Sequence, residues 1–414
     1  MALPRTSLST FLTHAKQTLR TALRTNTPVT LVIGNTSADL DSMSSAILYA
    51  YVRSAAPPRT AFTPLYIPVT NMRAAGLAAR PEFLAVFKSA GVEGGQLITL
   101  DDLPALEGVG DVLEPRNTAW VLVDHNVLVG ELGRVYGGRV RGVIDHHEEE
   151  GGVPRDTGEE PRVVEKSGSC SSLVVGYVRA AWEGLGGGEE AARWDAEVAQ
   201  LGLASVLIDT ANLQDGSKTT DHDRRAVEYL EGKIRACPQV AAGYDRTAFY
   251  EAIDAAKQDI GSLRLRDILQ KDYKEWEQSD GQKLGISSVV KPIPFLLDKA
   301  GEEAGSAASD AFLGQLRSFA EERGLDLYSI MTTSTSPTGA FQRELLLWAL
   351  SEKAAAWAEA FAAASREELG LEDWDGDADV ARSSGNGRWR RVWWQRQVQH
   401  SRKRVAPLLR QAHD

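Results

Sequence analysis

The sequence predicts an α/β protein whose N-terminal part is a parallel sheet with helices on both faces. Four apolar runs of strand length occur before residue 150, and stretches with helical periodicity separate them. Strands that alternate with helices build parallel sheets, because each helix crosses a face of the sheet on its way to the next strand. In such sheets ligands bind at the carboxyl ends of the strands. Aspartate and histidine are concentrated at these ends, so a functional site is expected there.

The composition is that of a chain with more than one domain. Its 414 residues are too many for one ordinary core, and 43% hydrophobic and 25% charged residues are common globular values. No apolar run approaches the roughly 20 residues of a membrane-spanning helix, so no membrane segment is expected. Two cysteines, Cys170 and Cys237, cannot form a disulfide framework, which is typical of a reducing compartment. The net charge of −11 argues against a nucleic-acid partner, although local cations or metal ions could still hold a small polyanion.

The N-terminal segment can be interpreted in two ways. Residues 1–38 contain Arg and Lys but no acid, and apolar residues recur at helical spacing from Leu8 to Leu23. This pattern is found in mitochondrial transit peptides and also in an amphipathic first helix that packs on its own domain. A strand begins immediately afterwards, which favours the packed helix. We therefore expect a cytoplasmic protein, with the mitochondrial matrix as the alternative.

The first half contains the predicted sheet elements in order. The strands are TLVIG (30–34), LYIPV (65–69), AWVLVD (119–124) and RGVIDH (141–146). Helices are predicted at Ser42–Arg53 and from Pro81, and the Gly-, Glu- and Pro-rich residues 151–161 are a predicted surface loop. A helix-like stretch, DAEVAQLGLASVLIDT, then ends at Asp209 and Thr210.

The second half is predicted to be a smaller α/β domain. We place domains at 1–235 and 250–414, with a linker at 236–249. The expected elements of the second domain are a helix from Tyr250, the charged stretch 263–276, the strands GISSVV (285–290) and LYSIMTT (327–333), and an alanine-rich helix at 344–364. The acidic stretch 367–379 and the basic stretch 388–410 are simplest to interpret as solvated surface, unless the basic one faces a phosphate.

Four polar motifs carry the candidate chemistry: GNTSADLDS (34–42), LVDHN (122–126), GVIDHHEEE (142–150) and LIDTANL (207–213). A single aspartate at a strand end is more often a helix cap or turn residue than a ligand. Here, however, five candidate ligands would converge at one sheet edge without nearby Lys or Arg: Asp39, Asp41, Asp124, His146 and Asp209. So many carboxylates need raised pKa values or bound cations. Oxygen ligands with one imidazole suit two divalent ions, Mg²⁺ or Mn²⁺, which Asp124 could bridge.

Taken together and in this order, GNxxADLDS, VDHN, IDHH and GSCSSLV resemble the DHH phosphoesterase superfamily. LRLRDILQKDYKEW and the late SRK resemble the second domain of its DHHA2 branch. The resemblance runs from about residue 28 to 410 and is nearest to the fungal cytosolic exopolyphosphatases, with the prune phosphodiesterases next. Family II pyrophosphatases and RecJ-type nucleases usually carry His where this chain has Asn35, and prune proteins tend to alter the triplet that is intact at Asp145–His147. The resemblance implies a DHH domain, a smaller DHHA2 domain, and an active site in the cleft between them.

The resemblance also implies roles for single residues. Asp39 and Asp124, with Asn35 near them, would hold one metal ion, and the second would be held by Asp41, Asp124, His146 and Asp209. His147 would face the scissile phosphate as a hydrogen-bond or proton donor, and Asp145 would orient a histidine. Expected phosphate contacts are Ser401, Arg402 and Lys403. Further candidates, for which a solvated surface charge is an equal alternative, are Lys218, Arg266, Lys271, Lys274 and Arg343.

These expectations point to a monomeric exopolyphosphatase that hydrolyses terminal orthophosphate from linear inorganic polyphosphate with a metal-activated water. An inorganic pyrophosphatase or a prune-like phosphodiesterase of the same superfamily is the alternative. A metal-binding regulatory scaffold without activity is the alternative of another class. The sequence does not give the preferred chain length, the physiological metal or a role for His125.

Overall fold

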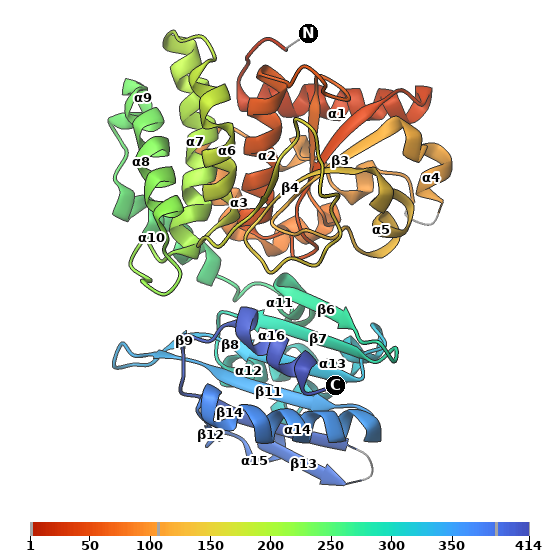
Figure 1. Cartoon of the computed structure of the whole chain (residues 1–414). Coiled ribbons are helices and arrows are strands. Elements are labelled where there is room, and N and C mark those ends of the chain that lie inside the picture. The colour runs from red at the N-terminus through yellow and green to blue at the C-terminus, as the bar shows by residue number, and fades with distance from the viewer. Residues whose placement is uncertain (1–2, 106–107, 386–387, 414) are drawn as a thin grey trace. The chain divides into compact units, whose positions relative to one another are not determined.

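The computed structural model, which describes residues 3–105, 108–385 and 388–413, divides into two units, Met1–Lys257 and Gln258–Asp414 (Figure 1). The stretch proposed as a linker, 236–249, contains helix α9 (Pro238–Ala241) and the start of α10 (Arg246–Gln258). Arg246 Nε donates to Glu231 Oε1 at 2.7 Å, and Ile253 is buried in the first core. The contacts of α10 thus place it in the first unit, and the division falls just before the last residue of this helix, Gln258.

The first unit is built on a five-stranded sheet with the order β2-β1-β3-β4-β5. Every neighbouring pair is parallel, which confirms the predicted sheet. The strands are β1 (Val29–Ile33), β2 (Tyr66–Val69), β3 (Thr118–Val123), β4 (Val140–Asp145) and β5 (Arg162–Val164). All residues of β1, β2 and β3 are buried, because helices cover both faces of the sheet, and this explains their continuous apolar runs.

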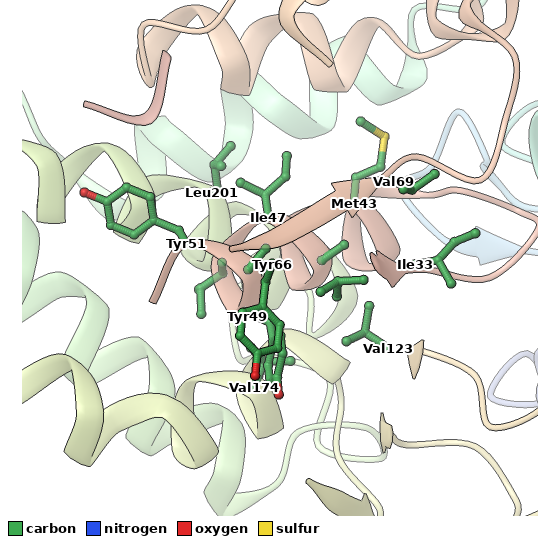
Figure 2. Close-up of a cluster of buried hydrophobic side chains, with 14 of the residues drawn as sticks. Ile33, Met43, Ile47, Tyr49, Tyr51, Tyr66, Val69, Val123, Val174 and Leu201 are labelled. Carbon is green, nitrogen blue, oxygen red and sulfur yellow. The ribbon is translucent and has the colours of Figure 1, made fainter. Parts of the chain in front are cut away.

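The main helices of this unit are α1 (Leu8–Thr25), α2 (Leu40–Ala55), α3 (Pro81–Ser89), α5 (Gly130–Tyr136), α6 (Cys170–Glu183), α7 (Glu189–Asp209) and α8 (Asp221–Arg235). Shorter helical turns are η1 (Ala74–Ala79), η2 (Gly94–Gln96), η3 (Leu100–Asp102), α4 (Val109–Val112), η4 (Pro115–Asn117) and η5 (Gly137–Arg139). Helix α2 is buried over nearly its whole length, and its Met43, Ile47 and Tyr49 meet side chains of β1, β2, α6 and α7 (Figure 2). The start of α2 is therefore fixed against the end of β1.

Helix α1 confirms the prediction of an amphipathic helix packed on the domain. Ser7 Oγ accepts a hydrogen bond from Thr10 N at 3.2 Å and caps the helix. The apolar face, including Leu8, Phe11 and Leu12, belongs to the first core, and the rings of Phe11 and Tyr51 meet edge to face at 5.3 Å.

The second unit contains a mixed seven-stranded sheet with the order β12-β14-β11-β8-β7-β6, and β13 pairs with β14. Only β7 and β8 run parallel among its described pairs. The strands are β6 (Tyr273–Glu277), β7 (Lys283–Val289), β8 (Leu327–Thr332), β11 (Glu344–Ala349), β12 (Leu371–Asp373), β13 (Arg382–Gly385) and β14 (Arg388–Gln395), and β9 (Ser334–Thr335) and β10 (Phe341–Gln342) form a separate hairpin.

The helices of this unit are α11 (Leu265–Lys271), α12 (Ile293–Ala304), α13 (Ala308–Glu321), α14 (Glu352–Leu369), α15 (Ala378–Ala381) and α16 (Arg402–Gln411). The two faces of the sheet belong to different cores. Leu346 and Trp348 join the core that contains α12 and α13, whereas Leu345 and Leu347 join the core that contains α14 and α16. This alternation follows from the two-residue repeat of a strand.

The prediction of one helix over 344–364 is wrong at its beginning. Residues Glu344–Ala349 form β11, and α14 begins only at Glu352, where Ser351 Oγ accepts from Ala354 N at 3.3 Å. The run ELLLWA is buried on both sides, so it has no polar alternation that would have distinguished a strand from a buried helix. Among the described helices, none combines the length and the apolar character needed to cross a membrane.

Candidate metal centre

The candidate ligands follow three neighbouring strands. Asn35 lies just beyond β1, Asp124 directly follows β3, and Asp145 ends β4. The chain leaves β1 for β2 on one side and reaches β3 on the other, so the strand order reverses between β1 and β3. Loops diverge at such a point and leave a crevice beyond the carboxyl ends of the strands. The fold therefore brings these three loops to one edge of the sheet, as predicted for a parallel sheet.

Asp124 lies at the centre of this cluster and is only 2% exposed. Its Oδ1 is 3.1 Å from His146 Nε2 and 3.7 Å from His147 Nδ1. Its Oδ2 accepts hydrogen bonds from Asn35 Nδ2 at 2.8 Å and from Ser42 Oγ at 2.7 Å. Burial, together with the charges of Asp39 and Asp41, raises the pKa of Asp124 to about 7. Such a carboxylate needs a proton or a cation nearby.

Asn35 supports Asp124 from the end of β1. Its Nδ2 donates to the side chain and, at 3.1 Å, to the main-chain oxygen of Asp124, and its Oδ1 accepts from Ser37 N at 2.8 Å. In this arrangement the amide holds Asp124 in place. That Asn35 lies near a metal ion stays a prediction.

Asp39 has a capping role as well as a place in the cluster. Its Oδ1 accepts from Ser42 N at 3.0 Å and thereby caps helix α2. Its charge also contributes to the raised pKa values of Asp124 and Asp209. The two interpretations of a strand-end aspartate, cap and ligand, are therefore compatible at this residue.

Asp41 is held by five hydrogen-bond donors from three helices. They are Ser45 Oγ (3.3 Å), Ser169 Oγ (2.8 Å), Cys170 N (2.6 Å), Ser171 N (2.9 Å) and Ser205 Oγ (2.8 Å). Burial alone would raise the pKa of Asp41, but His146, whose Nε2 lies 3.8 Å from Asp41 Oδ2, lowers it together with the hydrogen bonds from Cys170, Ser171 and Ser169. The segment SGSCSS (167–172) thus holds the Asp41 carboxylate through three of these hydrogen bonds.

His146 and His147 are oriented by different acceptors. Ser167 O lies 3.1 Å from His146 Nδ1 and can only accept, so that nitrogen carries a hydrogen, and Nε2 faces the carboxylates of Asp124 and Asp41. Asp145 Oδ1 lies 2.8 Å from His147 Nδ1, and Asp145 Oδ2 accepts from Asn126 Nδ2 at 2.6 Å. Burial would raise the pKa of Asp145, but His147 and Asn126 lower it well below its usual value. Asp145 is completely buried, so it supports the histidine and does not itself reach solvent.

Asp209 ends helix α7 with an orphaned oxygen. Its Oδ2 is buried and has no hydrogen-bond partner among the described residues. Burial and the charges of Asp41 and Asp39 raise the pKa of Asp209 well above its usual value, against the opposing effects of Lys257 and His146. Beyond Thr210, the residues Ala211–Leu213 have φ angles of 49°, 57° and 65°, which is a costly left-handed turn for residues other than glycine.

The donor set fits divalent cations. Asp124, His146 and His147 each place one ligand atom within 4.8 Å of the others. Asp41 and Asp39 interact electrostatically with Asp124, and Asp209 supplies a buried oxygen without a donor. Carboxylates with one or two imidazoles are typical ligands of Mg²⁺ and Mn²⁺.

Most of the supporting residues were not predicted from the sequence. Ser42 and Asn126 lie inside the recognised motifs, and their short polar side chains were a usable signal. Ser45 lies four residues after Asp41 on helix α2, whereas Ser205 lies inside α7, far along the chain from Asp41, and no local pattern marks it.

The expected phosphate contacts are distributed over both units. Ser401 caps α16, and Arg402 Nη2 lies 2.7 Å from Asp272 Oδ1. Lys403 is exposed in the first turn of α16, Lys271 is buried at the end of α11, and Lys274 lies on β6. Arg343 donates to Val398 O, Arg266 pairs with Glu322, and Lys218, in the first unit, pairs with Asp215.

Two family models match the chain. The model of the DHH family, N-terminal domain, matches residues 29–206, and the model of the DHHA2 domain matches residues 251–412. A Schizosaccharomyces pombe protein named as a candidate exopolyphosphatase is 31% identical over 414 residues, which is 97% of each chain. The Bos taurus exopolyphosphatase PRUNE1 is 28% identical over 322 residues, which is 76% of this chain and 62% of that protein. Among solved structures, a candidate family II inorganic pyrophosphatase from Methanococcus jannaschii covers 93% of this chain and 99% of its own, with a TM-score of 0.57 and 21% identity, and so shares the fold.

Proposed function

This chain belongs to the DHH phosphoesterase family and carries a DHHA2 domain in its second half, and we propose that it is an exopolyphosphatase. It would remove terminal orthophosphate from linear inorganic polyphosphate. The observation that carries the metal-dependent chemistry is the buried cluster around Asp124, in which Asp209 keeps an oxygen without a donor. The choice of substrate is supported by the similarity, over nearly the whole chain, to the S. pombe protein named for this activity.

The site would hold two divalent ions, Mg²⁺ or Mn²⁺. Asp39 and Asp124 would bind one of them, and the ligands of the other would be Asp41, Asp124, His146 and Asp209. When bound, such ions neutralise phosphate charge and acidify a water molecule. Asn35 and Ser42 both donate to Oδ2 of Asp124, and Asn35 also donates to its main-chain oxygen. These hydrogen bonds fix the orientation of the Asp124 carboxylate.

His147 would give a proton to the leaving oxygen. Its side chain is 26% exposed, so it can reach a substrate, whereas the Asp145 carboxylate behind it is buried. Asp145 accepts the hydrogen on Nδ1 and its own pKa is lowered, so it remains anionic and stabilises a protonated ring. The proton available to the substrate is then the one on Nε2. Asn126 donates to Asp145 Oδ2 and thereby fixes the orientation of the Asp145 carboxylate toward His147.

A long polyanion also needs cations beyond the metal ions. Arg402 and Lys403, with Ser401 at the cap of α16, are the proposed phosphate contacts of the second unit, and Lys271, Lys274 and Arg343 are further candidates. Asp272 holds the Arg402 guanidinium in one orientation, which leaves less side-chain entropy to lose when a phosphate binds.

The substrate is tested by comparing four compounds. Purified protein with Mg²⁺ or Mn²⁺ is offered long-chain polyphosphate, tripolyphosphate, pyrophosphate and a cyclic nucleotide, and released orthophosphate or nucleotide is measured. We expect phosphate from polyphosphate. Release from pyrophosphate alone would make the chain a pyrophosphatase, hydrolysis of the nucleotide alone would make it a phosphodiesterase, and no turnover of any compound would favour a regulatory scaffold.

The role of Asp124 is tested by substitution. Asp124 has a φ of 61°, a left-handed conformation that asparagine tolerates better than alanine, so Asp124→Asn removes the charge with little backbone strain. We expect turnover to be lost in Asp124→Asn and in Asp124→Ala. Asp101→Asn, at an exposed aspartate that pairs with Arg73, is the control and should keep full activity. Substantial activity in Asp124→Asn would refute the assignment of Asp124 as a shared ligand.

A further inference from the structure

A small pocket lies between helices α6 and α8, outside the carboxylate cluster. Its volume is about 190 Å³, and its lining includes Ser172, Gly176, Arg179, His222, Arg225 and Tyr229. Pockets for drug-sized ligands are roughly 300–1,000 Å³, so this one suits a much smaller ligand. A Cβ added at Gly176 would meet no atom within 4 Å, which shows that the groove is open beside α6.

The pocket is lined by basic groups from both helices. Arg225 is exposed, and its guanidinium has no hydrogen-bond or ion-pair partner in the described parts of the chain. Arg179 lies over the ring of Tyr229, with 4.9 Å from its Cζ to the ring centroid, and Nε2 of His222 is 3.3 Å from Glu165 Oε2. The pocket therefore presents two guanidinium groups and an imidazole. The guanidinium of Arg225 has no counter-charge among the described residues.

Two of the acidic groups near the pocket are largely in solvent, whereas Asp223, behind Ser172, and Asp195, which acts on Tyr229, are buried and already accept hydrogen bonds. The side chain of Glu183, which pairs with Arg179 at 2.8 Å, is 51% exposed, and that of Glu165 is 56% exposed. Glu228 acts on Arg179 only as a weaker electrostatic neighbour. Exposed ion pairs of this kind are worth about 0–1 kcal/mol, so an anion that engages both arginines can compete with them.

A buried donor adds to the charges. The hydroxyl of Tyr229 is buried and has no hydrogen-bond partner among the described residues. Burial raises the pKa of Tyr229, so the hydroxyl keeps its proton near neutral pH. A buried hydroxyl without a partner is costly unless something accepts its hydrogen bond.

We propose that the pocket between α6 and α8 is a phosphate-binding site, in which Arg179 and Arg225 grip the oxygens of a phosphate group and Tyr229 donates to one of them. The planar fork of a guanidinium matches phosphate oxygens, and two forks on neighbouring helices can share one tetrahedral anion. The phosphate group could come from orthophosphate or from a polyphosphate chain. The site goes beyond the proposed function and does not depend on it, because none of its residues belongs to the metal centre.

The pocket has a structural link to that centre. Ser172, in its wall, donates to Asp223 Oδ1 at 2.6 Å, and Asp223 also accepts from Gly168 N and Ser169 N. Ser169 in turn holds Asp41. A phosphate in the pocket would therefore lie beside the segment that fixes one of the proposed metal ligands.

The test measures binding to the full chain after metal ions are removed on a chelating resin. Without metal ions the carboxylate cluster repels anions, so it does not contribute to binding. Orthophosphate and tripolyphosphate are titrated separately by isothermal calorimetry. Similar affinities for both would identify a single phosphate group as the ligand, and binding of tripolyphosphate alone would identify a chain. Either result supports the site when it is lost in the Arg225 variant described next, since the phosphate contacts proposed for the second unit would keep their binding there, and no binding of either probe overturns it.

The variants locate the binding. Arg225→Ala should weaken binding about tenfold or more, and Tyr229→Phe, which removes only the hydroxyl, should weaken it about threefold. Arg224→Ala removes the same charge from the adjacent, exposed position of α8 that does not line the pocket, and it should bind like the unaltered protein. Unchanged binding in Arg225→Ala, or an equal loss in Arg224→Ala, would overturn the proposal. Circular dichroism confirms that each variant is folded.

Discussion

Asp223 is a fully buried carboxylate that joins helix α8 to the segment holding Asp41. It accepts five hydrogen bonds, from Gly168 N (2.9 Å), Ser169 N (3.2 Å), Ser172 Oγ (2.6 Å), Thr220 N (2.7 Å) and Thr220 Oγ1 (2.8 Å). The three main-chain N–H groups among them require an acceptor at Asp223, because an N–H group can only donate. We predict that Asp223→Asn, which is nearly the same size, destabilises the protein and loosens the metal centre.

The expected fall in the free energy of unfolding follows from the donors that face each of the two carboxylate oxygens. Oδ2 faces the main-chain N–H groups of Gly168 and Thr220, and Oδ1 faces that of Ser169. In either orientation the amide NH₂ of asparagine points at a main-chain donor, which then loses its acceptor. An unsatisfied buried donor costs about 1–3 kcal/mol, and the remaining bonds lose the strength that an ionised acceptor gives. We therefore expect the free energy of unfolding to fall by about 2–4 kcal/mol.

The assay is urea denaturation followed by far-ultraviolet circular dichroism. Asp221→Asn is the matched control, because Asp221 is an exposed acid in the first turn of the same helix. It removes only a favourable charge at the helix N-terminus, worth about 0.3–1 kcal/mol. The Mn²⁺ affinity of Asp223→Asn should also fall, since Gly168 and Ser169 lead into the segment that holds Asp41. A loss of stability no larger than that of Asp221→Asn would refute the reasoning.

Two further substitutions test the centre itself. In Gly34→Ala the new Cβ would lie 2.5 Å from Ser42 Cβ and displace the hydroxyl that holds Asp124, so we expect a loss of about 1–3 kcal/mol and of turnover; an unchanged melting temperature and normal activity would contradict this. In Asp209→Asn a carboxylate with one buried oxygen that has no donor is replaced by a neutral amide, so the metal-free protein should melt at a higher temperature than the unaltered one. The rise in melting temperature on adding Mn²⁺ should shrink in the same variant, and a lower metal-free melting temperature would count against the assignment of Asp209 as a ligand.

The parallel sheet could be predicted because its strands are buried on both faces. Continuous apolar runs such as AWVLVD admit few alternatives when helical stretches separate them. The same property misled the prediction at Glu344–Ala349, where a strand between two cores has the same apolar run as a buried helix. The edge strand Arg162–Val164 was not predicted, because it is short and only partly buried.

The candidate site could be predicted as a set of residues, and its internal contacts could not. Asp124 and His146 follow neighbouring strands, so the topology alone brings them together. Which donors hold each carboxylate depends on how helices pack, as for Ser205, which reaches Asp41 from the middle of α7. The amide of Asn35 is a further example, since the sequence places it near the centre but does not show that it donates to Asp124.

The two units, which have separate cores, also differ in their tryptophan content and therefore in their intrinsic fluorescence. The first unit contains Trp120, Trp182 and Trp194, whereas the second contains Trp276, Trp348, Trp357, Trp374, Trp389, Trp393 and Trp394. Intrinsic fluorescence therefore reports chiefly on the second unit, while every proposed metal ligand lies in the first. A fluorescence melting curve would register the opening of the first core only through its minority of tryptophans, of which Trp120 and Trp182 are buried. Ion uptake is better followed by a signal from helices or from the ion itself.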